Sequence, residues 1–501
     1  MGARAETAPA ASGSTVRLPV TSGEHLPVGR ANPAPAPGVA SVPGVASVPA
    51  DELPAPARKR VYVETYGCQM NISDGELMAG ILERRGYAVA DTPGQADVVL
   101  VNTCAIREHA ERRVLGRVSQ LNGLKRDNPD LVIGVTGCMA QRMGDTLLEQ
   151  APYVDLVMGP DGYRELPERL DALSEPGRRL SVLSLDPSEN YEGLEQRRTS
   201  RISAWVPIQR GCDHRCTFCI VPYVRGPEKN RRPEEVLAEI RGIAVTGVTE
   251  VTLLGQTVNS YASGEWSFAR LLAGVARIPG IRRVRFTSPH PNDVTPELVE
   301  VMASEPAVCE QLHLPAQSGN NRTLKRMLRR YTVESFLERV EMVREAIPDI
   351  ALSTDIICAF PGETRSDFED TLDLLRTVRF DDVYTYRYSP REGTPATRMP
   401  AHWFIEDGEA AARLSELIGV ARSIQTAINR SEVGRVEEVL VEREARGPEQ
   451  MLGRTRRGKV VAFAAPPSLE GAYATVELTG TTGATFTGRQ LANGFQPPEP
   501  T

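Results

Sequence analysis

The stretch AWVPIQRGCDHRCTFC, residues 204–219, joins an apolar run to a loop with three cysteines. The run predicts a β-strand, and Cys212, Cys216 and Cys219 follow with the spacing Cys-x3-Cys-x2-Cys. Structural zinc sites usually pair Cys-x2-Cys or Cys/His units that lie far apart, so this spacing is too tight for one. Three close thiolates can hold an iron–sulfur cubane and leave one iron open to another ligand. His214 would have to fold back to become a fourth ligand, and we do not expect it to be one.

Outward from this loop, residues 200–430 alternate between strand-like and helix-like segments. Helical periodicity is clear in PEEVLAEIRGIAVTG (233–247) and TVESFLERVEMVREAIP (332–348). The alternation predicts a partial (βα)6 barrel, whose chemistry is expected at the carboxyl ends of its strands. The three-cysteine loop follows the first strand, where such a site belongs. The six expected strands are residues 204–211, 250–258, 282–288, 310–317, 350–360 and 382–390.

A second α/β domain is expected over residues 58–195, where short β-rich runs alternate with stretches such as ELMAGILERRG (76–86). The runs are VYVETYGC (61–68), VVLVNTC (98–104), VIGVTGC (132–138) and VDLVMG (154–159). The first three end in Cys68, Cys104 and Cys138, at separations of 36 and 34 residues. Carboxyl ends of parallel strands meet at one edge of a sheet, so the three thiols are expected to converge there. Buried structural thiols are the alternative, but Gly67, Thr103 and Gly137 precede them in a way that suits close backbone approach to a ligand.

The two ends of the chain differ from this α/β texture. Residues 1–57 are rich in Ala, Pro, Gly, Ser and Val with a tandem six-residue repeat, and they predict a disordered tail. Residues 431–495 carry short β runs broken by Gly and Pro, including 437–444, 458–464 and 472–480, and predict a small β-barrel. Cys309 and Cys358 lie in apolar strand contexts and are expected to be core thiols.

The composition limits the setting. With 501 residues the chain is expected to form several domains, and its formal net charge of -7 predicts no overall attraction to nucleic acid. Any such binding must come from local basic groups. No apolar run is long enough to span a membrane and no signal peptide is evident, so we expect a cytoplasmic protein with reduced cysteines.

The cysteine loop, with Phe218 before its third cysteine, resembles that of the radical S-adenosylmethionine (SAM) enzymes. The wider resemblance covers residues 60–490 and is to the methylthiotransferases, in particular to members that act on N(6)-dimethylallyladenosine in tRNA. Residues 73–76, SDGE, and Thr257 depart from the commonest family choices. The similar segments are YGCQMN (66–71), NTCAIRE (102–108), GCMAQR (137–142), LLGQTVNSY (253–261), TSPHP (287–291), LHLPAQSGNNRTLKRMLRRYT (312–332) and SPREGTPA (389–396).

This resemblance implies an activity and its cofactors. Cys212, Cys216 and Cys219 would hold the catalytic 4Fe-4S cluster, with SAM on its open iron. Cys68, Cys104 and Cys138 would hold a second 4Fe-4S cluster that presents sulfur. The product would be a methylthio group on carbon 2 of dimethylallyladenosine, next to the anticodon of tRNA. Phe218, Gly255, Gln256, Ser288 and Gln317 would contact SAM, although the last four are also ordinary polar or small loop residues.

The resemblance also implies partners. Two basic groups are candidate tRNA contacts, and the C-terminal domain resembles RNA-binding TRAM modules. A solvated charged surface is the alternative for the first group. A low-potential electron donor of flavodoxin or ferredoxin type and a sulfur donor are expected, and no membrane. The first group is Arg322, Lys325, Arg326, Arg329 and Arg330, of which Arg322, Arg326 and Arg329 are expected on one helical face, and the second is Arg454, Arg456, Arg457 and Lys459.

Other functions remain open at this point. Related methylthiotransferases act on threonylcarbamoyl adenosine in other tRNAs or on an aspartate of a ribosomal protein. These usually have Pro-Lys or Lys-Val where this chain has Gln69-Met70. A non-catalytic iron–sulfur sensor or electron carrier is a further alternative, but it has no use for an open iron together with a barrel and an RNA-binding module.

Overall fold

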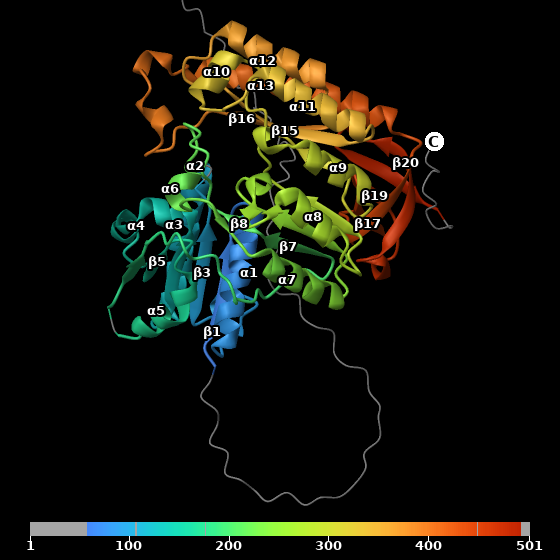
Figure 1. Cartoon of the computed structure of the whole chain (residues 1–501). Coiled ribbons are helices and arrows are strands. Elements are labelled where there is room, and N and C mark those ends of the chain that lie inside the picture. The colour runs from blue at the N-terminus through green and yellow to red at the C-terminus, as the bar shows by residue number, and fades with distance from the viewer. Residues whose placement is uncertain (1–57, 106–107, 176, 448, 492–501) are drawn as a thin grey trace, which may run out of the picture.

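The computed structural model describes residues 58–105, 108–175, 177–447 and 449–491. The predicted tail over residues 1–57 and the last residues of the predicted β-barrel lie outside these ranges. A central α/β domain is flanked by an N-terminal α/β domain and a C-terminal β-barrel, coloured blue to teal and red in Figure 1. The predicted fold class of three such units is confirmed.

The N-terminal domain is built on a six-stranded parallel sheet with the order β2-β1-β3-β4-β5-β6. Strand β3 is buried along its whole length because helices cover both faces of the sheet. One apolar cluster lies under α1 and α5, and another lies under α2, α3 and α4. The bounds are β1 Arg60–Thr65, α1 Gln69–Arg84, β2 Ala88–Val89, β3 Val98–Thr103, α2 Glu108–Asn122, β4 Val132–Gly137, α3 Cys138–Met143, α4 Asp145–Gln150, β5 Leu156–Met158, α5 Leu166–Ala172 and β6 Leu180–Val182.

The central domain contains all six predicted barrel strands, in two parallel three-stranded sheets ordered β7-β10-β13 and β14-β15-β16. A single parallel bridge, Val284 to Val308, links the two halves. The result is the partial barrel that the alternation predicted. Its bounds are β7 Ser203–Pro207, α7 Pro233–Val245, β10 Glu250–Leu254, α8 Phe268–Ala276, β13 Arg283–Phe286, α9 Pro296–Ser304, β14 Gln311–His313, α10 Asn321–Arg326, α11 Val333–Ala346, β15 Ala351–Cys358, α12 Arg365–Val378 and β16 Asp382–Arg387.

Short elements complete the central domain. Strands β8 and β9 form an antiparallel ribbon beside the cysteine loop, and β11 and β12 form a small hairpin. The long helix α13 packs against α12 and β16 and leads into the C-terminal domain. The bounds are β8 Gln209–Arg210, α6 Val221–Val224, β9 Lys229–Asn230, β11 Ala262–Ser263, β12 Trp266–Ser267 and α13 Asp407–Ser431.

The C-terminal domain is a closed five-stranded barrel with the order β17-β18-β19-β21-β20. Three of its strands match the predicted β runs. The other two, β18 and β21, were not predicted, because QMLGRT and TFTGRQ contain a glycine and few apolar residues. They become strands through pairing with their neighbours in the closed barrel rather than through local preference. The bounds are β17 Val436–Glu444, β18 Gln450–Thr455, β19 Val460–Ala464, β20 Tyr473–Thr481 and β21 Thr485–Gln490.

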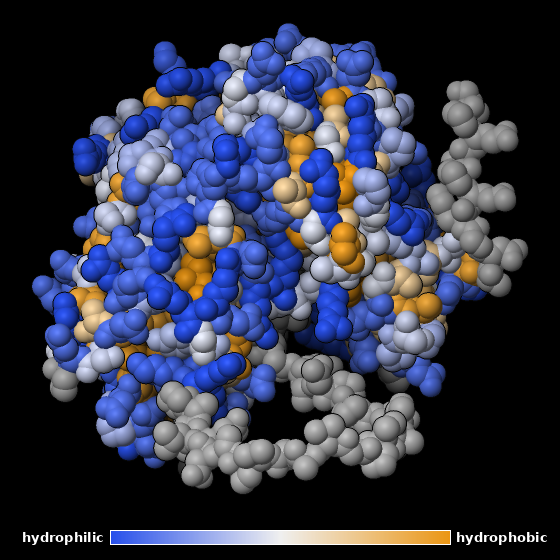
Figure 2. Space-filling model, turned by 60° about the horizontal axis from the view of Figure 1, so that its bottom comes forward, coloured by the Kyte–Doolittle hydropathy of each residue, from blue (hydrophilic) through white to orange (hydrophobic). Residues whose placement is uncertain are grey.

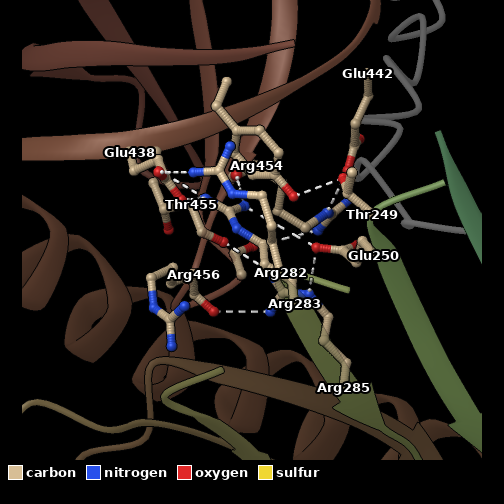
Figure 3. Close-up of polar contacts among 12 residues, drawn as sticks. Thr249, Glu250, Arg282, Arg283, Arg285, Glu438, Glu442, Arg454, Thr455 and Arg456 are labelled. Atoms are coloured by element: carbon tan, nitrogen blue, oxygen red, sulfur yellow. Dashed lines mark hydrogen bonds and ion pairs between the residues drawn. The ribbon is translucent and has the colours of Figure 1, made fainter. Parts of the chain in front are cut away.

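Two arginines of β13 join the β-barrel to the central domain (Figure 3). Arg283 is fully buried and donates to the carbonyls of Arg454 and Glu438, at 2.8 and 2.7 Å. Arg285 donates to the carbonyls of Thr455 and Arg456, both at 2.8 Å. Arg283 therefore binds backbone oxygens of β17 and β18, and Arg285 binds those at the end of β18 and in the turn after it, which fixes this edge of the β-barrel against the central domain.

The four cations of the second predicted RNA-binding group pair with carboxylates, two of them across this interface and two within the C-terminal domain. Arg456 pairs with Glu310 at 2.7 Å, and Arg457 pairs with Glu432 at 2.9 Å. Lys459 is buried and pairs with Asp381 at 2.7 Å, while Arg454 pairs with Glu442 at 3.0 Å. The prediction of an RNA contact is wrong for Lys459, whose side chain is buried, and it stays a prediction for the other three cations. Their charges are neutralised by carboxylates, most of which come from other parts of the sequence.

Among the described residues, no helix is both long enough and apolar enough to cross a membrane. The face in Figure 2 is mostly hydrophilic, with apolar side chains in small separate groups.

The interface predicts a strong effect of Arg283→Met. The substitution leaves two buried carbonyls and Glu438 without their shared donor, so docking of the β-barrel is expected to weaken by about 3 kcal/mol. Urea unfolding followed by circular dichroism measures the loss. Arg277→Met is the control, because Arg277 is 72% exposed and its ion pair with Glu305 is screened by solvent, so the pair is worth about 1 kcal/mol or less. Equal effects of the two substitutions would contradict this role of Arg283.

Candidate active site

The three N-terminal thiols lie at the carboxyl ends of neighbouring parallel strands. Cys68 is the N-cap of α1 after β1, Cys104 follows β3, and Cys138 begins α3 directly after β4. The strands pair in the order β1-β3-β4, so the three loops share one edge of the sheet. Gly67 has φ +135°, and a Cβ there would lie 2.5 Å from the Cβ of Cys104. Only glycine therefore allows these loops to approach so closely.

Close approach shapes the electrostatics of these thiols. The pKa of Cys68 is lowered to about 6, chiefly because the Cys104 thiol hydrogen-bonds to it. Burial raises the pKa of Cys138, and the guanidinium of Arg225 opposes this effect. Arg225 donates its Nε–H to the Cys138 sulfur at 3.2 Å. The edge thus holds adjacent thiols with a cation beside them, a donor set suited to an iron–sulfur cluster.

The other three thiols lie in the loop after β8. Cys212 and Cys216 are buried and Cys219 is half-buried. The Oγ1 of Thr257 lies 3.0 Å from the Cys212 sulfur, and Arg329 donates to the Cys216 sulfur at 3.4 Å. Burial, followed by the neighbouring Cys216, raises the pKa of Cys219 to about 12. Metal binding here would therefore have to displace the proton of Cys219, because only the thiolate is a ligand.

His214 faces other polar groups within the same loop region. Its ring stacks on that of His290 with centroids 3.9 Å apart, and its Nε2 lies 3.4 Å from a carboxylate oxygen of Asp293. These contacts hold the loop between Cys212 and Cys216 against the segment that follows β13. That His214 is not a fourth cluster ligand stays a prediction.

The predicted SAM contacts lie around the mouth of the partial barrel. Gly255, Gln256, Ser288 and Gln317 follow β10, β13 and β14, and Phe218 packs edge-on against Phe360. Ser288 and Gln317 have left-handed backbones, with φ of 59° and 66°, as does Ala359 after β15, with φ of 58°. Three non-glycine residues in this costly conformation at successive strand ends are typical of a functional site. Ala359 was missed, because no local pattern announces it.

Two buried polar atoms at this mouth are candidate ligand contacts. The Oε1 atoms of Gln256 and Gln317 are buried and have no hydrogen-bond partner among the described residues. A Cβ at Gly255 would lie 2.8 Å from the side chain of Gln209, so a glycine keeps this part of the mouth open. Buried unsatisfied oxygens cost free energy unless a ligand donates to them, as the amino group of SAM can.

The two sets of thiols are joined by residues 219–225. Ile220 and Val224 pack against Ala105 and Cys138, directly after Cys219 in the chain. Arg225 then ends this segment at the Cys138 sulfur. A loop that carries one set therefore forms part of the wall of the other. This role of Arg225 was missed, because nothing in the local sequence indicates a contact across domains.

The residues of the first predicted RNA-binding group differ in exposure and in their partners. Arg329 is buried at the Cys216 sulfur, so its prediction as a phosphate contact is wrong. Helix α10 ends at Arg326, so the predicted helical face that includes Arg329 is also wrong. Arg322 pairs with Asp367, and Arg326 lies over the Trp403 ring. Lys325 and Arg330 are exposed, and among the described residues no carboxylate pairs with either. These two remain candidates for tRNA contact.

Comparison with known families and proteins agrees with this arrangement. Residues 60–159 match a model described as "Uncharacterized protein family UPF0004", residues 206–375 match the Radical SAM superfamily, and residues 430–490 match the TRAM domain. A tRNA-2-methylthio-N(6)-dimethylallyladenosine synthase of Carboxydothermus hydrogenoformans is 44% identical over 429 residues, covering 84% of this chain and 97% of that protein. One of Frankia casuarinae is 46% identical over 414 residues, covering 80% of this chain and 76% of that protein.

Solved structures share the fold at low sequence identity. The radical SAM methyltransferase TsrM from Kitasatospora setae, with cobalamin and a [4Fe-4S] cluster bound, is 14% identical with a TM-score of 0.52. The match covers 78% of this chain and 82% of that one. The cobalamin-dependent radical SAM enzyme OxsB is 14% identical with a TM-score of 0.50, over 73% of this chain and 56% of that one.

The loop geometry predicts that Gly211→Ala damages the barrel thiol site. Gly211 has φ +77°, and a Cβ there would lie 1.9 Å from the Pro227 carbonyl oxygen, directly before Cys212. Alanine at this position costs about 1–3 kcal/mol in backbone strain, because it must adopt a left-handed conformation. The steric clash with Pro227 adds to this cost, so the loop must move. We expect a large loss of iron bound after anaerobic reconstitution.

Gly264→Ala provides the matched control for this substitution. Gly264 also has a positive φ, +57°, but a Cβ at this position in the β11–β12 turn would have nothing within 4 Å. The control has the strain without the clash and is expected to keep its iron. Full iron binding by Gly211→Ala would show that the loop tolerates displacement and would contradict this account.

Proposed function

The chain belongs to the family of tRNA-2-methylthio-N(6)-dimethylallyladenosine synthases, and from this premise we propose its reaction. It adds a methylthio group to carbon 2 of N(6)-dimethylallyladenosine next to the anticodon of tRNA, in the cytoplasm. The observation that carries the proposal is the pair of three-thiol sets, held against each other by residues 219–225. Activating carbon 2 of the base needs a radical, and forming the methylthio group needs a sulfur atom. Two separate thiol sites can each serve one of these steps.

The barrel thiols suit the 4Fe-4S cluster and SAM that characterise the radical SAM superfamily. Cys212, Cys216 and Cys219 would hold the cluster. The amino group of SAM can donate to the orphan Oε1 atoms of Gln256 and Gln317. Phe218 and Ser288 lie at the same mouth and would contact the rest of the molecule. These residues bind and orient, while burial excludes water from a reactive site.

The N-terminal thiols suit a second 4Fe-4S cluster. Cys68, Cys104 and Cys138 offer three converging sulfurs and, like the barrel set, would hold a cluster by three ligands. When bound, the cofactors supply a 5'-deoxyadenosyl radical at the barrel and a sulfur atom at the N-terminal site. Two further partners are required by this chemistry: a low-potential electron donor of flavodoxin or ferredoxin type, and a sulfur donor.

The alternative substrates receive no support from a particular feature of the site. The relatives above carry the dimethylallyladenosine name, and Gln69-Met70 stands where enzymes for threonylcarbamoyl adenosine or ribosomal aspartate usually differ. An iron–sulfur electron carrier does not account for the orphan amide oxygens at the barrel mouth.

The proposed substrate predicts a strong preference for prenylated tRNA. Burial of the dimethylallyl group contributes about 2–3 kcal/mol of binding, or about 30- to 150-fold in affinity. The measurement is nucleoside analysis of one tRNA prepared with and without the prenyl group, after reaction with the reconstituted enzyme. Comparable turnover of both forms would refute the substrate, and a methylthiolated threonylcarbamoyl adenosine in place of this product would identify the alternative.

The exposed cations predict a salt-dependent contact with tRNA. Reversing the charge of Lys325 and Arg330 to Glu should weaken binding and reduce the slope of log affinity against log salt by about one unit for each phosphate that is no longer bound. Binding is measured by fluorescence anisotropy over a range of salt concentrations. The control reverses Arg277 and Arg376, which are 72% and 56% exposed in the same domain. If both double variants behave alike, only net charge matters and the surface is solvated.

A further inference from the structure

The structure contains a buried arginine whose position at the N-terminal thiols has no role in the reaction described so far. Arg225 is 4% exposed and belongs to the loop of the barrel domain. Its Nε–H donates to the Cys138 sulfur at 3.2 Å, and its NH2 donates to Asp74 at 2.7 Å. Its NH1 is buried and has no partner among the described residues.

The charges around Arg225 do not cancel. Asp74 is 1% exposed and is shared by two arginines, since Arg210 also contacts it at 3.1 Å and lies over the ring of Tyr191. One carboxylate therefore faces two guanidinium groups. A buried excess of positive charge is costly unless an anion lies beside it, and the Cys138 sulfur is adjacent. Burial opposes the charge of Arg225, but Asp74 and then Cys138 raise its pKa well above the usual value.

A buried arginine also donates to a sulfur of the barrel thiol set. Arg329 donates to the Cys216 sulfur at 3.4 Å, and its other donors bind the Pro315 carbonyl and the Tyr331 hydroxyl. Each set thus has one sulfur that accepts from a buried arginine. Of these two arginines, Arg225 alone binds a carboxylate within the described residues, so substitution at Asp74 can change the net charge beside Cys138.

We propose that Arg225 is a positioning residue that orients Cys138 and raises the reduction potential of the N-terminal cluster. This inference rests on the proposed function, which places a 4Fe-4S cluster on Cys68, Cys104 and Cys138. A hydrogen bond and a positive charge at a ligating sulfur stabilise the reduced cluster, which carries one more negative charge. Asp74 limits the effect by neutralising part of the guanidinium charge.

The test uses the full chain with Cys212, Cys216 and Cys219 replaced by Ala, so that only the N-terminal set can hold a cluster. Its midpoint potential is measured by redox titration followed by electron paramagnetic resonance. Arg225→Gln removes the positive charge and should move the midpoint to a more negative value. Asp74→Asn removes the opposing negative charge and should move it to a more positive value.

Lys229→Gln is the matched control. Lys229 is buried in the same interdomain contact and pairs with Asp161 at 2.7 Å, and no hydrogen bond joins its side chain to a sulfur among the described residues. Its substitution should leave the midpoint unchanged, whereas a shift equal to that of Arg225→Gln would assign the effect to domain packing and overturn the proposal.

The outcomes separate this inference from the proposed function. Absence of iron in the triple-alanine parent, where about four irons are expected, refutes the second cluster itself. Iron retained with an unchanged midpoint in Arg225→Gln overturns the role of Arg225 alone. If Arg225→Gln does not retain its cluster, the midpoint potential of Asp74→Asn tests the proposal instead. A midpoint more positive than that of the parent supports the proposal, and a midpoint equal to that of the parent overturns it.

Discussion

The buried contact of Arg225 with Cys138 and Asp74 is the interaction on which the arrangement of the site depends. Both α/β domains bring their thiols to the carboxyl ends of parallel strands, as parallel sheets require. Two such edges have no reason to face each other unless something joins them. Residues 219–225 do so, because Cys219 begins the segment in one site and Arg225 ends it in the other. Lys229 and Asp161 add a second buried ion pair nearby.

Arginines of β13 likewise fix the position of the β-barrel against the central domain. Arg283 and Arg285 bind backbone carbonyls at the end of β18 and in the turn after it, so the position of this domain is set by its main chain. Arg456 and Lys459 then meet carboxylates of the central domain. Two basic residues of the TRAM domain therefore serve its attachment to the central domain. Removing either partner of such buried pairs is costly, which makes the interface sensitive to single substitutions.

The sequence allowed much of this fold to be predicted, for a physical reason. Strands such as β10 and β15 are short, largely buried runs between helices, so the alternation is visible in the sequence. The cysteines of each set follow strands directly, so their convergence follows from topology. The contacts of Arg456 and Lys459 could not be predicted, because a run of cations looks the same whether its partners are phosphates or distant carboxylates. The segment 73–76 and Thr257 depart from the commonest family choices; Thr257 contacts the Cys212 sulfur, and Asp74 of that segment binds Arg225 beside Cys138.

The central claim is that the two thiol sets have separate tasks. It is tested most directly by quantifying 5'-deoxyadenosine and methylthiolated nucleoside together, under anaerobic reduction, for Cys216→Ala and Cys138→Ala. The account predicts neither product from Cys216→Ala, and 5'-deoxyadenosine without methylthiolated nucleoside from Cys138→Ala. Full methylthiolation by Cys138→Ala would contradict it, because sulfur would then reach the base without the N-terminal thiols.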